Sequence, residues 1–132
     1  MSAVPVDQLI DLLDRRIVVL DGAMGTMVQG LGLANEADWR GTELANHSHS
    51  VKGCTDVLAL TQPAAIEGIH YQFLRAGADI VETDTFTATS LALADYGLEP
   101  YVQAINIAAA QAARRATCAA ATLISRTALS SP

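Results

Sequence analysis

The chain has 132 residues, the size of one ordinary domain, and 51% hydrophobic residues against 17% charged ones supply enough apolar material for a core. Its formal net charge of −6, without any cluster of Lys and Arg, excludes a surface built to bind nucleic acid. The first hundred residues hold no charge-free apolar stretch of the ~18 residues that a membrane span needs, and no signal peptide is recognisable. We therefore expect a cytoplasmic protein with neither nucleic-acid nor membrane partners.

The first half of the chain reads as a helix, a strand and a long connection. Apolar residues recur at helical spacing between residues 6 and 13 and predict a short amphipathic helix. The apolar run 17–20 predicts the first strand, because it is rich in β-branched residues and stops abruptly at Asp21. A polar stretch rich in Gly, Asn, His and Ser then predicts a connection from residue 24 to about residue 60.

The second half begins with a helix, for which Thr61 is the expected N-cap, Pro63 lies in the first turn and Gly77 is the end. The other predicted elements are a strand over 79–83, a threonine-rich loop over 84–89, a helical turn over 90–96 and a long helix from about 100 to 121. Two parallel strands joined by a helix form a βαβ unit, which occurs both in open doubly wound sheets and in closed (β/α)8 barrels. The pattern alone leaves these two architectures open.

Asp21 stands where the first predicted strand ends, and residues 82–89 stand at the end of the second. Because ligands bind at the carboxyl ends of parallel strands in both architectures, we expect these residues to form the chemically active end of the molecule. An aspartate followed by glycine is also a common turn former, and on the residues alone that interpretation stays open.

Several motifs in one order carry a family resemblance: RRIVVLDGAMGTMVQ, ADWRGTEL, KGCTDVLALTQPAAIEGIHYQFLRAGADIVETDTFTATSLALADYGLE and QAINIAAAQAARRA. From about Leu9 to about Ala116 the chain resembles the start of the homocysteine-binding domain of cobalamin-dependent methionine synthases, within the homocysteine S-methyltransferase family. The resemblance implies an α/β fold, a partial (β/α)8 TIM barrel made of the first two β/α units and an N-terminal helix. Residues 1–132 would then be an N-terminal fragment of that barrel domain, with a divergent tail over 117–132.

The resemblance also implies a chemistry. Members of this branch bind homocysteine, hold its sulfur on zinc as a thiolate and transfer to it a methyl group carried by cobalamin on another module, which yields methionine. The ammonium of the amino acid needs a carboxylate, and its carboxylate needs N–H donors, which Asp21 and the following turn amides would supply. The substrate-binding residues predicted in this way are Asp21, Gly22, Ala23, Met24, Glu82 and Thr83.

Departures from the family pattern limit what is carried over. The three cysteines that hold zinc in the family lie on late barrel strands, so we assign no zinc ligand and no catalytic residue, and we expect neither the zinc ligands nor the cobalamin module in this chain. Cys54 stands where relatives tend to have asparagine, and Asp84 replaces the asparagine of the usual ETNTF motif. Residues 117–132 do not continue as a third barrel strand. We therefore expect a truncated piece that is inactive alone.

Two other functions stay open on the sequence. The chain could be a pseudoenzyme or half-barrel interaction module, completed by the remainder of the barrel on another chain. It could also be a small doubly wound α/β protein that binds another carboxylated metabolite through Asp21 and the threonine-rich loop.

Overall fold

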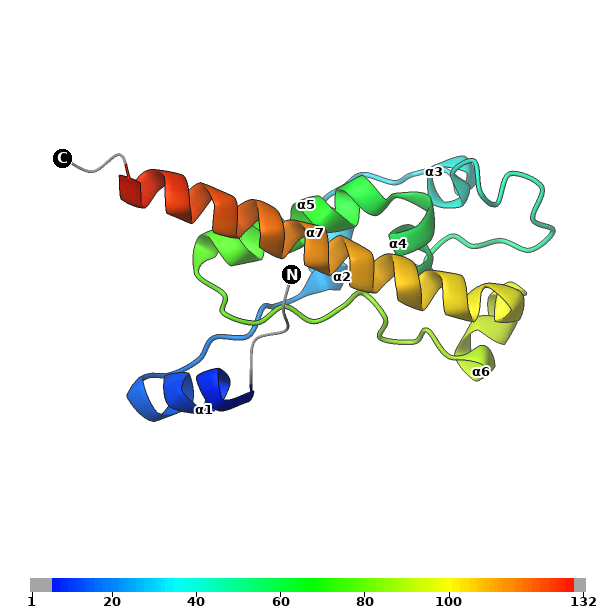
Figure 1. The fold of residues 1–132 in the computed structure, drawn as a ribbon. Coiled ribbons are helices and arrows are strands. Elements are labelled where there is room, and N and C mark those ends of the chain that lie inside the picture. The colour runs from blue at the N-terminus through cyan, green and yellow to red at the C-terminus, as the bar shows by residue number, and fades with distance from the viewer. Residues whose placement is uncertain (1–5, 130–132) are drawn as a thin grey trace.

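The computed structural model describes residues 6–129, and the side chains of residues 6–121. Helices make up most of this part of the chain (Figure 1). In chain order the elements are α1 (Val6–Arg15), α2 (Met24–Gln29), α3 (Glu36–Arg40), the 3-10 turn η1 (Thr55–Val57), α4 (Leu58–Thr61), α5 (Pro63–Ala76), α6 (Ser90–Leu93), the 3-10 turns η2 (Ala94–Tyr96) and η3 (Glu99–Tyr101), and α7 (Val102–Leu129). None of the described helices is long and apolar enough to cross a membrane.

The predicted partial (β/α)8 barrel is wrong, because the chain between residues 6 and 129 forms no strand. The two segments predicted as strands, 17–20 and 79–83, run side by side but meet at one isolated parallel bridge, between Leu20 and Ile80. The half-barrel module and the doubly wound α/β protein also require a sheet, so the described residues contradict these two folds as well.

Two aspartate side chains explain why the pairing stops after one bridge. A parallel ladder would continue with bonds between backbone N–H and C=O groups on both sides of the bridge. Instead, the Val19 N–H donates to Asp79 Oδ2 at 2.9 Å, and the Glu82 N–H donates to Asp21 Oδ1 at 3.1 Å. Each carboxylate thus takes a donor that the next rung would need, and both segments stay extended without becoming strands.

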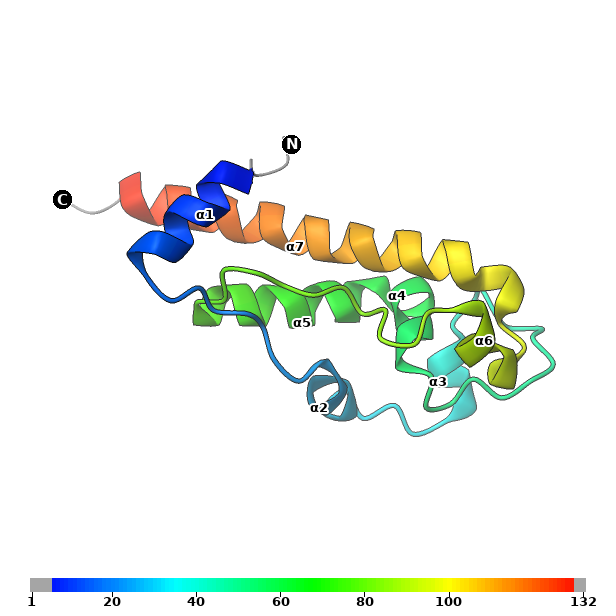
Figure 2. The ribbon, with the colours of Figure 1, turned by 90° about the horizontal axis from the view of Figure 1, so that it is seen from below.

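The helices α5 and α7 lie side by side in both views and form the centre of the molecule (Figure 1 and Figure 2). α5 buries Ile66 and Ile69, and α7 faces it with the fully buried side chains of Ala109, Ala112 and Ala116. These alanines recur at helical spacing, and their small side chains let the two helix axes approach closely. Both predicted long helices are confirmed in this pair, and α7 runs on to residue 129.

The ends of α5 differ in part from the prediction. Gly77 ends the helix as expected, in the left-handed conformation at φ +110°, which favours glycine. Thr61 is not the N-cap, because it closes α4 and its hydroxyl donates to the carbonyl of Trp39 at 2.8 Å. Gln62 precedes α5 instead.

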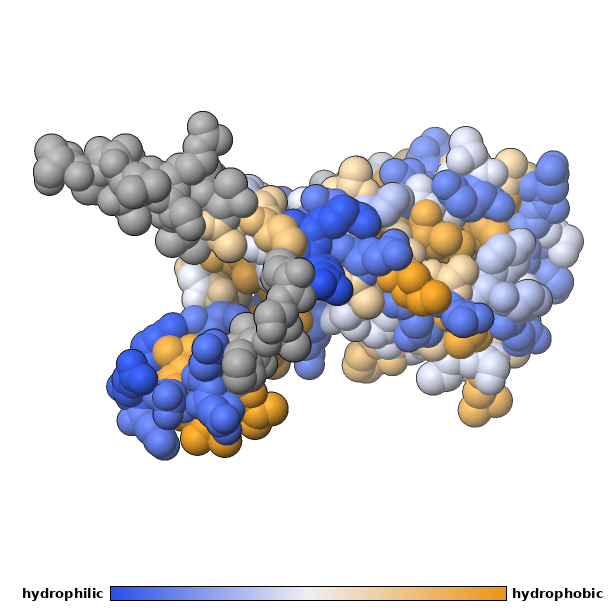
Figure 3. Space-filling view, viewed as in Figure 1, coloured by the Kyte–Doolittle hydropathy of each residue, from blue (hydrophilic) through white to orange (hydrophobic). Residues whose placement is uncertain are grey.

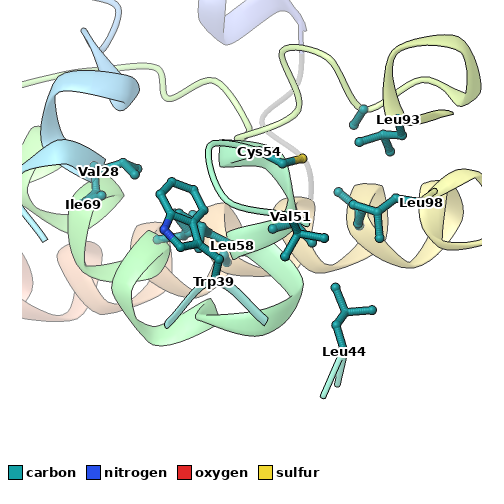
Figure 4. Packing of buried hydrophobic residues seen from close by; sticks show 14 residues of the cluster. Val28, Trp39, Leu44, Val51, Cys54, Leu58, Ile69, Leu93 and Leu98 are labelled. Atoms are coloured by element: carbon teal, nitrogen blue, oxygen red, sulfur yellow. The ribbon is translucent and has the colours of Figure 1, made fainter. Parts of the chain in front are cut away.

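The predicted connection over residues 24–60 holds α2, α3, η1 and α4, and it supplies much of the core. Trp39, Leu44, Val51, Cys54 and Leu58 are all buried, and they gather beside α5 and α7 in Figure 4. The carboxylate of Glu36 on α3 ties this region together, since it accepts from Ser50 Oγ and the Val51 N–H, each at 2.7 Å, and from Arg40 Nε at 2.9 Å. These hydrogen bonds hold the pKa of Glu36 down at about 2, with that from Ser50 the largest cause.

The predicted N-terminal helix is confirmed as α1, but it stands apart from the helical body in Figure 1 and buries none of its residues. Figure 3 shows apolar side chains open on its surface. Val6, Ile10 and Leu13 are each at least half exposed.

Candidate functional site

A cavity of about 610 Å³ lies where the two extended segments end. Its volume falls within the roughly 300–1,000 Å³ of small-molecule sites. The residues that line it come from the turn after residue 20, from η1 and from the loop after residue 81: Asp21, Gly22, Met24, Gly25, Thr55, Glu82, Thr83, Asp84, Thr85 and Phe86.

Five of the six residues predicted from the sequence therefore lie on one cavity: Asp21, Gly22, Met24, Glu82 and Thr83. Ala23 is not among the lining residues and stands just before α2 as its N-cap. Thr55 is the lining residue with the least signal in the sequence, because it belongs to a region predicted as an irregular connection.

Backbone hydrogen bonds bring the two halves of the cavity together. Val19 C=O accepts from the N–H groups of Asp79 and Ile80 at 2.8 and 3.2 Å, and Ile80 C=O accepts from the Asp21 N–H at 2.9 Å. Arg16 forms a bidentate ion pair with Asp79, in which Nη1 donates to Oδ2 at 2.7 Å and Nη2 donates to Oδ1 at 2.6 Å. The Arg16 guanidinium holds the pKa of Asp79 down at about 2, helped by the Val19 N–H. This Arg16–Asp79 clamp fixes the start of one segment against the start of the other.

Asp21 presents a carboxylate whose side chain is only 4% exposed. Oδ1 accepts from the Glu82 N–H at 3.1 Å, and Oδ2 faces Nδ1 of His70 at 3.9 Å. Both contacts reach residues far along the chain, whereas a turn-forming aspartate accepts from its own backbone about two residues on. The carboxylate therefore stands in the cavity wall with lone pairs left for a further donor.

Gly22 follows Asp21 under the aromatic ring of Phe73 on α5. A Cβ added at this glycine would lie 3.3 Å from Phe73 Cε1, which is tighter than most such contacts. The glycine thus allows the turn to pack closely on α5, and this places Asp21 above the helix that carries His70.

Asp84, in the cavity wall, and Asp56, which is not a lining residue, form a buried acidic pair. Asp84 lines it and is 5% exposed, whereas Asp56 is fully buried and accepts from the Thr87 N–H at 2.8 Å and from Thr87 Oγ1 at 2.5 Å. Among the described residues Asp84 Oδ2 and Asp56 Oδ1 have no hydrogen-bond partner. Burial, with repulsion from Asp56, raises the pKa of Asp84 to about 7, so near neutral pH about half of this carboxyl is uncharged.

The described residues do not fit a zinc site, because they hold no group of three or more His, Cys, Asp and Glu side chains that could bind a metal ion. Cys54 is buried, and burial raises the pKa of its thiol to about 11, which disfavours the thiolate that a metal needs. Cys118 is exposed on α7. His47 Nε2 lies 2.7 Å from the carbonyl of Tyr96, so its contact joins its loop to the 3-10 turn η2.

A cavity walled by carboxylates and threonine hydroxyls, with a buried aspartate at a fixed turn, is a candidate small-molecule site whose charge suits a cationic group. Comparison with known proteins then assigns the family: the chain matches the family model of homocysteine S-methyltransferases over residues 18–131. The chain belongs to this family, whose members are methyltransferases that act on homocysteine and in general depend on zinc.

Proposed function

We propose that this chain supplies the homocysteine-binding part of a methyltransferase of the methionine synthase type, in which methylcobalamin donates the methyl group that converts homocysteine to methionine. Family membership supports the substrate, and the resemblance of the sequence motifs supports the methionine synthase branch. Because the described residues do not fit zinc, no step that activates the sulfur is assigned to them.

One observation carries the proposal, namely the charge pattern of the cavity that contains Asp21. Within the part of the chain that the structure describes, the lining includes the carboxyl groups of Asp21, Glu82 and Asp84 and no basic side chain. Such a wall attracts the ammonium of an amino acid. The carboxylate of the amino acid would then depend on N–H donors of the turn over residues 22–24 and on the hydroxyls of Thr55 and Thr83.

Asp21 is the best placed of the three carboxyl groups to receive the ammonium. Its side chain is almost fully buried, so little water competes for it, and the Glu82 N–H already fixes Oδ1. Glu82 is exposed at the rim, and Asp84 is partly protonated near pH 7. An ion pair to the buried, oriented carboxylate is the strongest of the three.

The test is the affinity for reduced L-homocysteine, measured by calorimetry on the full chain and on Asp21→Asn. Asn keeps the shape of the turn and removes the charge, so we expect binding to weaken by about 10- to 100-fold, or about 1.5–3 kcal/mol. Asp95→Asn is the matched control, since Asp95 is exposed on η2 and does not line the cavity. Unchanged affinity in a folded Asp21→Asn variant would leave Asp21 as a turn former only.

A second ligand isolates the ammonium. 4-Mercaptobutyrate has the thiol and the carboxylate of homocysteine but no amino group. The unsubstituted chain should prefer homocysteine to this analogue, and Asp21→Asn should lose most of that preference. If the ratio of the affinities for homocysteine and the analogue were the same in both proteins, the pairing of Asp21 with the ammonium would be contradicted.

A further inference from the structure

His70 is a buried histidine that the proposed function does not yet use. It lies on α5 with its side chain 0% exposed, and among the described residues neither ring nitrogen has a hydrogen-bond partner. Leaving both polar atoms of a buried imidazole unpaired costs free energy, so the position calls for a physical reason.

The atom that faces His70 belongs to the cavity wall. Nδ1 lies 3.9 Å from Asp21 Oδ2, while the other carboxylate oxygen accepts from the Glu82 N–H. That separation is about 1 Å beyond an N–H···O hydrogen bond, and bonds of this kind in binding sites commonly tighten when the ligand is in place.

We propose that His70 is the positioning residue for Asp21: its Nδ1–H donates to Oδ2 from behind the cavity wall and, with the Glu82 N–H on Oδ1, fixes the plane of the carboxylate that receives the substrate ammonium. This inference rests on the proposed function and deepens it, because it assigns a role to a residue that does not itself touch the substrate.

The chemistry of a buried, neutral imidazole suits this role. Burial lowers the pKa of His70, and the nearby Asp21 offsets only part of that effect, so the ring is mostly uncharged at pH 7. A neutral ring can donate one hydrogen bond and thereby orient the carboxylate, yet it does not cancel the negative charge. A Lys or Arg in the same place would compete with the ammonium for Asp21.

Little rearrangement is needed to shorten the 3.9 Å between Nδ1 of His70 and Asp21 Oδ2 to a hydrogen bond. Gly22, next to Asp21, packs against Phe73, which lies three residues after His70 on the same helix. The turn and the helix face that carries His70 are thus already in contact, and a shift of a side chain is enough to close the remaining gap.

Two variants separate positioning from packing. His70→Leu removes the donor and fills much of the space, whereas His70→Asn keeps an N–H donor near the position of Nδ1. We expect His70→Leu to weaken L-homocysteine binding by about tenfold and His70→Asn to recover most of that loss. Ile69→Val, at the neighbouring buried position of α5, controls for altered packing and should leave the affinity unchanged. Equal affinity in folded His70→Leu and the unsubstituted chain overturns the inference.

A measurement without any substitution keeps the test decisive if His70→Leu does not fold. Nitrogen-15 NMR of the unsubstituted chain reports which ring nitrogen of His70 carries the proton. We expect the proton on Nδ1 in the homocysteine complex, with a change in the Nδ1 resonance as the ligand is added. A proton on Nε2 alone overturns the inference, because Nδ1 could then not donate to Asp21. Absence of homocysteine binding by the unsubstituted chain is a separate outcome, which overturns the proposed function and the inference with it.

Discussion

The α5–α7 pair and the N-terminal arm, residues 6–20, both carry apolar side chains at helical spacing, but the pair buries them and the arm leaves them exposed. Ile66, Ile69 and Ile105 in the pair are at most 1% exposed, whereas Ile10 and Ile17 in the arm are 50% and 86% exposed. The pair has a stripe of buried alanines that lets two helices meet, and no residue of α1 is buried. An apolar face is therefore buried only where a second element of matching shape faces it.

Truncating a core side chain is the strongest way to test this contrast. Leu58→Ala removes a fully buried side chain from the core around Trp39 and should lower the free energy of unfolding by about 2–5 kcal/mol. Ile10→Ala is the matched change in the arm, and because this side chain is half exposed it should cost about 0.5 kcal/mol or less. Urea unfolding followed by circular dichroism measures both values, and similar losses for the two variants would refute the contrast.

The buried Asp84 gives a second, pH-dependent test. Its pKa is raised from 3.8 to about 7 in the folded chain, so the folded state holds a proton that the unfolded state releases at lower pH. Stability is therefore lost as the pH rises from about 4 to about 7, and the full penalty is present above that range.

Asp84→Asn removes this titration and should raise the free energy of unfolding at pH 8 by about 2 kcal/mol, with a smaller gain at pH 5. Glu82→Gln is the control in the same loop, since it also removes one carboxyl group but at an exposed position. The measurement is the urea midpoint across the pH range. A stability profile that keeps its slope between pH 4 and pH 7 in Asp84→Asn would show that another group is responsible.

The long helices and several residues of the cavity could be predicted from the sequence, because the patterns that indicate them are local. The helical spacing after Pro63, the end at Gly77 and the spaced alanines of α7 need no distant partner to be recognised. Asp21 and Glu82 were also predicted to lie at one end of the molecule, and both line the cavity.

The main error has its physical origin in long-range side-chain contacts. The strand pattern of residues 17–20 and 79–83 is real, but Asp79 and Asp21 take the N–H donors that a ladder would use. The short helix α3 was not predicted, although Asn35 and Asp38 form a capping box at its start, because it spans only five residues; Glu36 then ties it to residues 50 and 51. His70 gave no functional signal, since its full burial and its distance to Asp21 are visible only in the structure.

The clamp between Arg16 and Asp79 offers the smallest and most local test, because it joins the arm to the helical body at the surface. Arg16→Ala removes both contacts to the carboxylate, which still accepts from the Val19 N–H. An exposed ion pair contributes little to global stability, so the urea midpoint should hardly move. The pKa of Asp79, about 2 with the clamp in place, should rise toward its ordinary value in an NMR titration.

Hydrogen exchange should locate the effect of this variant. Without the clamp, the N–H groups of Val19, Asp79 and Asp21 should exchange faster, since they hold the two extended segments together, while those at the centre of α5 and α7 should keep their rates. Arg15→Ala is the control: Arg15 pairs within α1, with Asp11 at 3.7 Å, and does not reach the second segment. Unchanged exchange rates at these three positions in Arg16→Ala would contradict this prediction. The other hydrogen bonds between the two segments would then be sufficient to bring Asp21 to the cavity without Arg16.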